Sequence, residues 1–390
     1  MTMEERGAAL RTAFEGHYGL PPATAAYAPG RVEVLGNHTD YNEGLVLSAA
    51  INYGTFVLAA PVRGTECRLY DGKFKESAGF AVDARGPGAQ PSWANYLRGV
   101  YALLRERAGT PAPAVNLWIE GDVPLGAGLS SSAALEMAAT LALAPVLGVE
   151  LALRDIARLG QKAEHEYAGV RCGLLDQITS LFGRESALVE TDFRTLEVAT
   201  VPLDSELEFL IANTAVKHSL VDSAYNERRA KCEEAARYFA RVLSHPVQAL
   251  RDVSPADWAA HAGRMDPVAA RRSAHVVGEN DRVRRGAEFL KKGDGRAFGA
   301  LMFESHESSR IQFENSCPEL DALVTAARGM PEVLGARLSG GGFGGSAVIL
   351  APRSAADRVA AGLAASYRAA YGHPCEVLRI RASAGARRLW

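Results

Sequence analysis

Paired cysteines, long apolar runs and a basic leader are all missing from this chain of 390 residues. Its five cysteines are scattered and never spaced as CxxC, which argues against a disulfide scaffold or a zinc site. We therefore expect reduced thiols and a cytoplasmic protein. The most apolar stretch, 133–153, is interrupted by Glu136, Pro145 and Glu150, so we expect a buried helix there and no membrane span. The acidic start of the chain is unlike a signal peptide.

An excess of charge of either sign is also missing. The 43 basic and 45 acidic residues give a formal net charge of −2, so nothing indicates a surface for nucleic acid or for an anionic membrane. We expect small molecules as partners, neither nucleic acid nor membrane, and a monomer. The content of 48% hydrophobic and 23% charged residues is that of a globular protein long enough for two domains.

No lysine lies between Lys75 and Lys162, and this absence bears on the glycine-rich segment 126–132. A Walker-type phosphate loop has the pattern GxxxxGK[ST], in which the lysine reaches the outer phosphates. A Rossmann dinucleotide site has the pattern GxGxxG. The segment reads GAGLSSS and fits neither pattern. A phosphate held here would be bound by backbone, hydroxyls and helix dipole, without an ammonium group.

The same segment has the composition of an anion cradle at a helix N-terminus. Glycines let the backbone turn its N–H groups inward, serines add donors, and the first turn of a helix has unpaired N–H groups. Alternatively, the serines only cap the helix that follows, because serine is a favoured N-cap residue. In the first interpretation, the phosphate-binding residues are Gly126, Ala127, Gly128, Leu129, Ser130, Ser131 and Ser132.

Hydrophobic periodicity predicts an α+β architecture in two lobes, with a ligand cleft between them. The boundary falls near 205–215, so we expect domains at 1–205 and 206–390. Helices are expected at about 4–18, 93–107, 131–147, 152–168, 222–243, 267–291, 294–312, 318–328 and 354–370. Strands are expected at about 27–35, 55–60, 115–119, 187–190, 196–201, 209–212 and 375–380, with two more beside the glycine-rich segment 340–345.

Polar side chains gather directly after Gly36, downstream of Arg31. Short polar residues of this kind favour turns because they bond their own backbone. They also match a sugar site, which needs several fixed donors and acceptors that face adjacent hydroxyls. Both interpretations stay open for this group, which comprises Asn37, His38, Thr39, Asp40, Tyr41 and Asn42.

Two carboxylates and a second glycine-rich loop complete the candidate site. Glu164 could ligate Mg²⁺ and Asp176 could orient or deprotonate a substrate hydroxyl, as phosphoryl transfer requires. Alternatively, Glu164 is an exposed helix residue and Asp176 is a carboxylate favoured by the dipole at a helix start. The segment 340–345 is either a mobile hairpin or the second half of a nucleotide clamp.

Taken in order, these segments resemble galactokinases, which belong to a superfamily with homoserine, mevalonate and phosphomevalonate kinases. The similar segments are 29–42, 126–136, 169–177, 216–220, 223–229 and 338–346. Segment 29–42 is typical of galactokinases, whereas the glycine-rich loops in 126–136 and 338–346 mark only the superfamily. The resemblance implies the two-lobed α+β fold of the superfamily, with the active site in the cleft between the lobes. It also implies ATP and Mg²⁺ as cofactors, and transfer of the ATP γ-phosphate to the anomeric hydroxyl of D-galactose.

The resemblance also implies residue roles. Asp176 would be the catalytic carboxylate, and Arg31 would stabilise charge on Asp176 and on the transferring phosphoryl group. The Ser132 hydroxyl and Glu164 would reach Mg²⁺. Trp93 would lie near the nucleotide, although a core role suits so large an aromatic side chain nearly as well. The sugar-binding residues would be Asn37, His38, Thr39, Asp40, Gly173 and Tyr225.

One departure from the family concerns the sugar. Galactokinases usually carry Glu at the position of Asn37, and that acid accepts a hydrogen bond from the C6 hydroxyl. Because Asn is neutral and can both donate and accept, galactose still fits, but a uronic acid such as galacturonate would no longer meet a like charge there. N-acetylgalactosamine is a further alternative.

A different class of function is also open, namely a non-catalytic sensor of galactose and ATP. Such sensors have a disrupted serine loop, whereas residues 130–134 are intact here and Asp176 is present. A mevalonate-type kinase is disfavoured by the polar group at 37–42, because an apolar acid substrate has no use for so many hydroxyl partners.

Overall fold

The computed structural model contains two β-sheets, each with its own helices, and confirms the mixed α+β class. It describes residues 2–89, 91–109, 111–124, 126–170, 172–217 and 221–390. The larger sheet has the order β12-β1-β2-β5-β3-β4, with β6 on β2 and β7 on β6. Its strands are β1 (Thr24–Leu35), β2 (Leu45–Val62), β3 (Glu66–Asp71), β4 (Glu76–Ala81), β5 (Ala114–Gly121), β6 (Ala187–Asp192), β7 (Glu197–Pro202) and β12 (Arg387–Arg388).

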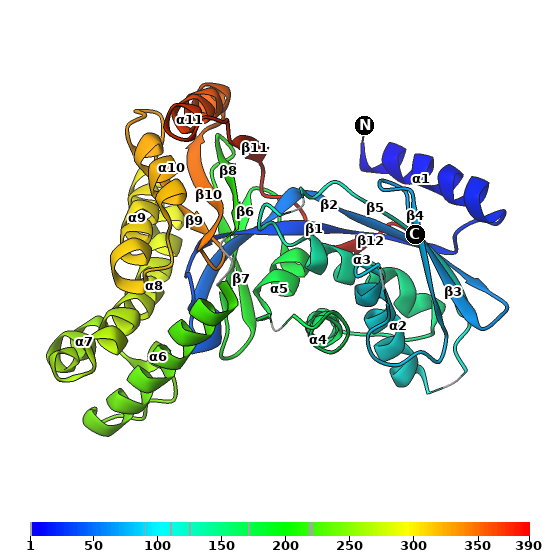
Figure 1. The fold of residues 1–390 in the computed structure, drawn as a ribbon, viewed down its shortest axis with the longest axis horizontal. Coiled ribbons are helices and arrows are strands. Elements are labelled where there is room, and N and C mark those ends of the chain that lie inside the picture. The colour runs from blue at the N-terminus through cyan, green and yellow to red at the C-terminus, as the bar shows by residue number, and fades with distance from the viewer. Residues whose placement is uncertain (1, 90, 110, 125, 171, 218–220) are drawn as a thin grey trace.

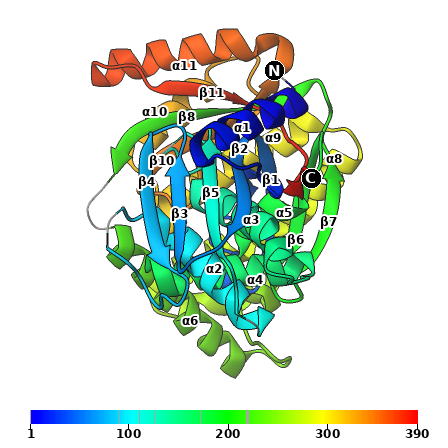
Figure 2. The same ribbon diagram turned by 90° about the vertical axis from the view of Figure 1, so that its right-hand side faces the viewer.

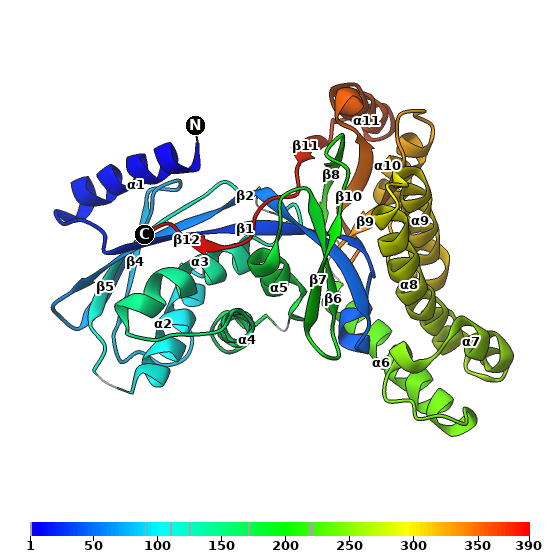
Figure 3. The same ribbon diagram turned by 180° about the vertical axis from the view of Figure 1, so that it is seen from behind.

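Helices cover both faces of the larger sheet. Its helices are α1 (Met3–Tyr18), α2 (Ala94–Ala108), α3 (Ser131–Val146), α4 (Leu153–Ala163) and α5 (Leu175–Phe182). Figures 1 and 3 show α1 on one face and α2 to α5 on the other. Leu97 of α2 and Leu143 of α3 pack with Val57 and Leu117 of the sheet, while Phe14 of α1 packs with Phe56 on the opposite face. Strand β1 is buried along its whole length because both of its faces are covered.

The second sheet has the order β11-β8-β10-β9 and is antiparallel. Its strands are β8 (Leu207–Lys217), β9 (Gly335–Ser339), β10 (Gly344–Pro352) and β11 (Glu376–Ile380). The remaining helices are α6 (Val221–Val242), α7 (Pro255–His261), α8 (Pro267–Lys291), α9 (Gly295–Ser308), α10 (Pro318–Arg328) and α11 (Ala356–Tyr371). Figure 2 shows α11 at one end of this lobe and α6 at the other. In the described part of the chain, no helix combines the length and the apolar character needed to cross a membrane.

The long helices begin and end where sequence signals place them. Helix α8 starts with Pro267 in its first turn, and the side chain of Asp266 accepts a hydrogen bond from the N–H of Ala269. Proline suits the first helical turn because its fixed φ and missing N–H cost nothing there. The predicted ranges 267–291 and 318–328 coincide with α8 and α10.

The two lobes meet along β1, which runs from the larger sheet to β9 (Figure 1). Ser339 of β9 donates a hydrogen bond to the carbonyl of Glu33 at 3.1 Å, and Arg337 donates one to the carbonyl of Val34 at 3.1 Å. Helix α8 also packs against β1 and β2. Because of this contact, residues of the second lobe lie close to the polar loop that follows β1.

Candidate active site

Asp176 lies at the start of α5 and is held from two sides. Arg31 of β1 donates from Nε to Asp176 Oδ1 at 2.7 Å, and its Nη2 lies 2.6 Å from the same oxygen. The hydroxyl of Ser130 donates to Asp176 Oδ2. The Arg31 side chain is only 10% exposed, whereas Asp176 is 24% exposed and lines a pocket. The carboxylate is therefore oriented by the protein and still open to a ligand.

The segment 126–132 adopts the conformation of an open helix N-terminus. Gly126 and Gly128 have φ of 73° and 72°, values that glycine reaches without steric cost. Ser130 occupies the N-cap position of α3, but it has φ of 56° and its side chain makes no capping hydrogen bond. The interpretation of Ser130 as a simple cap is therefore wrong. The first-turn N–H groups of α3 are left to bind an anion.

Both lobes anchor the loop that precedes α3. The Arg31 N–H donates to the carbonyl of Leu129 at 3.1 Å, and Arg31 Nη1 donates to the carbonyl of Gly128 at 2.7 Å. From the second sheet, Ser346 Oγ donates to the buried carbonyl of Ala127 at 2.8 Å. With its carbonyls tied down, the loop presents Ser131 and Ser132 to the neighbouring pocket.

Glu164 and Ser132 lie together, as expected for residues that share a ligand. Glu164 begins a short π-helical turn after α4, is 5% exposed, and accepts hydrogen bonds from the Ser132 hydroxyl and from Gln177 Nε2, the latter at 3.1 Å. The Cys172 thiol donates to the same carboxylate at 3.0 Å. Burial raises the pKa of Glu164, and Asp176 adds to the rise. A divalent cation would relieve this crowding of negative charge.

This donor set fits Mg²⁺ bound jointly with phosphates. Mg²⁺ usually takes one or two protein ligands and completes its shell with water and substrate phosphates. No group of three or more His, Cys, Asp or Glu side chains in the described residues is arranged to hold a metal ion by itself. Glu164 and Ser132 therefore supply part of a shell that a triphosphate would have to complete.

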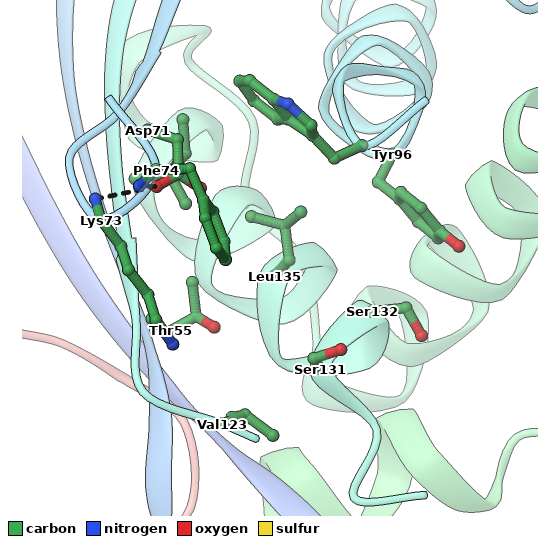
Figure 4. A pocket seen from close by; sticks show the side chains of 12 residues that line it. Thr55, Asp71, Lys73, Phe74, Tyr96, Val123, Ser131, Ser132 and Leu135 are labelled. Carbon is green, nitrogen blue, oxygen red and sulfur yellow. Dashed lines mark hydrogen bonds between the residues drawn. The ribbon is translucent and has the colours of Figure 1, made fainter. Parts of the chain in front are cut away.

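A pocket of about 250 Å³ opens beside the first turn of α3. Figure 4 shows Ser131 and Ser132 at one end of it, with Phe74, Leu135 and Tyr96 farther along. Trp93 also lines the pocket, and its indole N–H donates to Glu76 Oε2 at 2.7 Å. The lining is largely apolar and aromatic away from the serines, which suits a planar base attached to a phosphate tail.

A second pocket, of about 260 Å³, lies on the other side of Asp176. Its lining comes from both lobes, which agrees with the cleft predicted from the sequence. Seven of the predicted residues meet there, namely Arg31, Asn37, His38, Asp40, Gly173, Asp176 and Tyr225. Glu33, Cys172, Leu175, Gly340 and Gly341 complete the lining.

Asp40 and Gly173 face each other in this pocket. Burial, together with the nearby carboxylates of Glu33 and Asp176, raises the pKa of Asp40 to about 6. A Cβ atom on Gly173 would lie 2.4 Å from Asp40 Oδ2, so only glycine allows this carboxyl group its position. Gly173 thus shapes the pocket through its lack of a side chain.

His38 and Tyr225 form an aromatic wall of neutral donors and acceptors. The His38 ring nitrogens lie 2.9 Å from the Tyr41 hydroxyl and 3.2 Å from the carbonyl of Gly341. Burial lowers the pKa of His38 to about 4, so the ring is neutral near pH 7. Burial, with Asp40 nearby, raises the pKa of Tyr225, whose ring lies 5.2 Å from that of His38.

Thr39 was predicted to bind the sugar, but it does not line the pocket. Its side chain is fully buried and its hydroxyl is hydrogen-bonded to the carbonyls of Gly36 and Leu45, at 2.7 and 2.6 Å. The turn interpretation holds for this residue. Its contribution is to fix the loop that carries His38 and Asp40.

Asn37 lines the pocket, but its amide group is already bonded to protein. Its Nδ2 donates to Glu33 Oε1 at 2.9 Å and to the carbonyl of Gly340 at 2.7 Å. Its Oδ1 accepts from Asn315 Nδ2 at 2.9 Å. Both amide hydrogens are used by protein acceptors, so Asn37 has none left to donate to a sugar. Only a second acceptor position on Oδ1 is left.

Sequence reasoning missed the acid that stands beside Asn37. Glu33 is 5% exposed, lines the pocket and pairs with the fully buried Arg337, whose Nη1 lies 3.0 Å from Glu33 Oε1. It also missed Glu279 of α8, which accepts hydrogen bonds from the N–H groups of Gly36 and Asn37, both at 2.9 Å. The available signal was a charged residue within the otherwise apolar strand pattern at 32–35.

Comparison with known protein families agrees with this geometry. The family model described as "GHMP kinases N terminal domain" matches residues 95–184, and "GHMP kinases C terminal" matches residues 287–369. These matches define a class, the GHMP kinases, which are ATP-dependent kinases. A third model, the "Galactokinase galactose-binding signature", matches residues 12–61, which include β1 and the polar loop after it.

Individual relatives narrow the class. The galactokinase of Haemophilus influenzae (strain ATCC 51907) is 41% identical, over 91% of this chain and 92% of that protein. The galactokinase of Chloroflexus aggregans is 38% identical, over 96% of both. The crystal structure of Lactococcus lactis galactokinase complexed with galactose has a TM-score of 0.88 at 30% identity, over 97% of this chain and 99% of that chain. The chain belongs to the galactokinase family.

More distant structures share only the fold. The mevalonate kinase of Methanococcus jannaschii has a TM-score of 0.65 at 17% identity, over 92% of this chain and 98% of that chain. The resemblance to galactokinases within a superfamily of small-molecule kinases, drawn first from motifs, is thereby confirmed.

Proposed function

We propose that this chain transfers the γ-phosphate of ATP to the anomeric hydroxyl of D-galactose, which gives galactose 1-phosphate and ADP. One observation carries the proposal. Asp176 stands between the pocket lined by His38 and Asp40 and the open N-terminus of α3, and it is bonded to a residue of each side, Arg31 and Ser130. Membership of the galactokinase family supports the choice of sugar.

Asp176 would act on the hydroxyl that attacks the phosphorus. Its carboxylate would accept or orient the hydroxyl proton, and its two oxygens are already fixed by Arg31 and Ser130. Positioning of this kind converts an encounter in solution into a reaction within a single complex. Arg31 would then stabilise the negative charge that develops on the transferring group, because its guanidinium lies next to both the carboxylate and the phosphate loop.

The triphosphate would be held by the N-terminus of α3. The free N–H groups of the first turn, the hydroxyls of Ser131 and Ser132, and the helix dipole together favour an anion. The adenine base would lie in the pocket lined by Phe74, Trp93 and Leu135. No lysine is required at the phosphate loop in this arrangement.

Ser132 and Glu164 would hold Mg²⁺ together with the phosphates. When bound, Mg²⁺ would neutralise charge on the β- and γ-phosphates, which lowers the cost of bringing an electron-rich hydroxyl to the phosphorus. The support from this chain is the hydrogen bond between Ser132 and Glu164 and the raised pKa of the Glu164 carboxyl group.

We further propose two domains, 1–205 and 206–390, a cytoplasmic location and a monomer that needs neither nucleic acid nor membrane. The change of sheet between β7 and β8 supports the boundary, although β12 returns to the first sheet. The five cysteines are free thiols, as expected in a reducing compartment.

An assay of ADP release tests the proposed function. The chain should release ADP in the presence of ATP, Mg²⁺ and galactose, and kcat/KM for galactose should exceed the values for galacturonate, N-acetylgalactosamine and arabinose. A preference for another of these sugars would overturn the substrate but keep the reaction. Binding of ATP and galactose without any turnover would instead support the non-catalytic sensor.

A further inference from the structure

Glu33 is a buried acid at the sugar pocket that no motif had singled out. It lies on β1 between Val32 and Val34, both fully buried, yet its own side chain lines the same pocket as Asp40 and Asp176. A carboxylate at such a position needs partners, because a buried charge without them is costly.

The partners of Glu33 occupy one of its two carboxylate oxygens. Oε1 accepts from Asn37 Nδ2 at 2.9 Å and from Arg337 Nη1 at 3.0 Å. Among the described residues, none donates a hydrogen bond to Oε2 in the structure. A carboxylate has about four positions at which it can accept hydrogen bonds. Oε2 is therefore available to a ligand in the pocket.

Asn37 supports Glu33 and cannot replace it. Both amide hydrogens of Asn37 are used, one of them on Glu33 itself, and Asn315 donates to one of the two acceptor positions on its Oδ1. The neutral Asn37 thus helps to fix the orientation of the Glu33 carboxylate. The loss of an acid at 37 does not leave this side of the pocket uncharged.

We propose that Glu33 determines the sugar selectivity of this chain: its free carboxylate oxygen accepts a hydrogen bond from a hydroxyl of a neutral monosaccharide and repels a sugar acid. The inference rests on the proposed function and deepens it. It reverses the expectation that Asn37 opens the pocket to galacturonate.

The charge balance of the pocket favours the same conclusion. Glu33, Asp40 and Asp176 contribute carboxyl groups to the lining, whereas Arg31 is the cation among the described lining residues. After burial, Glu33 is the largest cause of the raised pKa of Asp40, so the charge of Glu33 is felt across the pocket. A carboxylate on the substrate would add a further negative charge to this set.

The decisive variant is Glu33→Gln, which keeps the shape of the side chain and removes its charge. We expect kcat/KM for galactose to fall by about 10-fold to 100-fold, mainly through KM, which is the size of effect expected for a hydrogen bond to a charged group. The ratio of kcat/KM for galacturonate to that for galactose should rise by a similar factor. An unchanged ratio would overturn the proposal.

Deoxy sugars identify the hydroxyl that Glu33 binds. The wild type and Glu33→Gln are compared with galactose and with its 2-, 3-, 4- and 6-deoxy forms. For the one analogue that lacks the partner hydroxyl, the substitution should change kcat/KM by less than about twofold, because the lost hydrogen bond is already absent. Equal losses with all five sugars would show that Glu33 acts only on the fold and would contradict the proposal.

Glu208→Gln is the matched control. Glu208 is 2% exposed and pairs with Arg379 at 2.5 Å and with Arg353 at 3.6 Å, so it is also a buried strand carboxylate held by arginine, but it lies outside the pocket lining. Its replacement should cost stability without a change in the ratio of the two sugars.

A second variant covers the case in which Glu33→Gln fails to fold. Removal of Glu33 leaves Arg337 as a buried charge without its partner, so Glu33→Gln combined with Arg337→Gln removes both. The double variant should show the same shift toward galacturonate. Failure of the wild type to phosphorylate any sugar would refute the proposed reaction. An active wild type that prefers galacturonate would keep the reaction but refute both galactose as the substrate and the role of Glu33.

Discussion

The hydroxyl of Ser130 donates a hydrogen bond to Oδ2 of Asp176, across 46 positions of the sequence. Ser130 occupies the N-cap position of α3 in a left-handed conformation, with φ of 56°, and does not cap the helix. Left-handed backbone costs about 1–2 kcal/mol for a residue with a side chain. The bond to Asp176 is thus accompanied by strained backbone and by a helix start without a side-chain cap.

We therefore expect Ser130→Ala to affect catalysis more than stability. The variant should lower kcat by about tenfold, because Asp176 loses one of the groups that orient it, and the melting temperature should change little. Ser254 is the contrast, since it caps α7 by accepting from the N–H of Asp257 at 3.1 Å. Ser254→Ala should cost about 1 kcal/mol of unfolding free energy and leave kcat unchanged. Equal effects of the two variants would contradict this assignment.

Replacement of Asp176, the proposed catalytic carboxylate, should separate chemistry from binding. Asp176→Asn should lower kcat by about 10²-fold to 10⁴-fold, the usual contribution of a positioned acid or base, while sugar affinity stays within about tenfold. Steady-state kinetics and calorimetric sugar binding would measure the two quantities. Asp192 is the control position: it is 19% exposed and paired with Arg251, as Asp176 is with Arg31, but it lies outside the pocket. Turnover retained in Asp176→Asn would refute the role of Asp176.

The metal dependence should change with Glu164. Glu164→Gln should raise the Mg²⁺ concentration needed for half-maximal activity by about tenfold or more, because a buried ligand oxygen is lost beside Ser132. Titration of ADP release with MgCl₂ measures this. Glu166, two residues along the same turn, is exposed and lies 3.8 Å from Lys162. Glu166→Gln should leave the Mg²⁺ curve in place. Overlapping curves for both variants would exclude Glu164 as a ligand.

Gly173 should be intolerant of any side chain. In Gly173→Ala the new methyl group would meet Asp40 Oδ2 at 2.4 Å and displace that carboxyl group. We expect KM for the sugar to rise by about tenfold while KM for ATP is retained, because the nucleotide pocket does not include Asp40. Gly263→Ala is the control, since a Cβ there has no neighbour within 4 Å. A parallel rise in both KM values would point to a general loss of structure.

Stability should fall in mild acid. Burial lowers the pKa of His38 to about 4 and that of His275 to about 3, from an ordinary value of 6.5. Both residues therefore bind protons more readily when the chain is unfolded. Their contribution to stability is complete above pH 6.5 and is lost as the pH falls toward 4, at roughly 1 kcal/mol per pH unit for each histidine.

Urea unfolding between pH 7 and 4.5 measures this dependence. His275→Asn should flatten the curve, because one of the two histidines with a lowered pKa is gone. His373→Asn should leave the slope as it is, since His373 is exposed. A slope that His275→Asn does not alter would contradict the assignment.

Much of the fold could be predicted because the long helices carry clear periodicity. The ranges of α8 and α10 were obtained to the residue, since proline marks the first turn of each. The hairpin of β3 and β4 was missed because its strands are only six residues long and β4 buries a single residue, Phe80, so little apolar pattern marks it. Strand β2 was predicted only at 55–60, because Asn52 and Gly54 interrupt a strand that in fact continues through them.

The site divides in the same way. Candidates that lie within a recognisable motif, such as Asp176 and Ser132, could be proposed from the sequence alone. The hydrogen bonds of the Asn37 amide group could not be predicted, because its partners Gly340 and Asn315 lie some 300 positions away in the second lobe. Which of two neighbouring polar residues faces a ligand depends on such distant contacts.

Strand β12 has a consequence for the order in which the molecule is made. Arg387 and Arg388 pair with Tyr27 and Ala26 at the edge of the first sheet, more than 350 positions earlier in the sequence. During synthesis the N-terminal lobe emerges first, but the edge of β1 stays unpaired until the second lobe and β12 have left the ribosome. Nascent chains stalled before position 387 should therefore expose that edge to chaperones and to proteases.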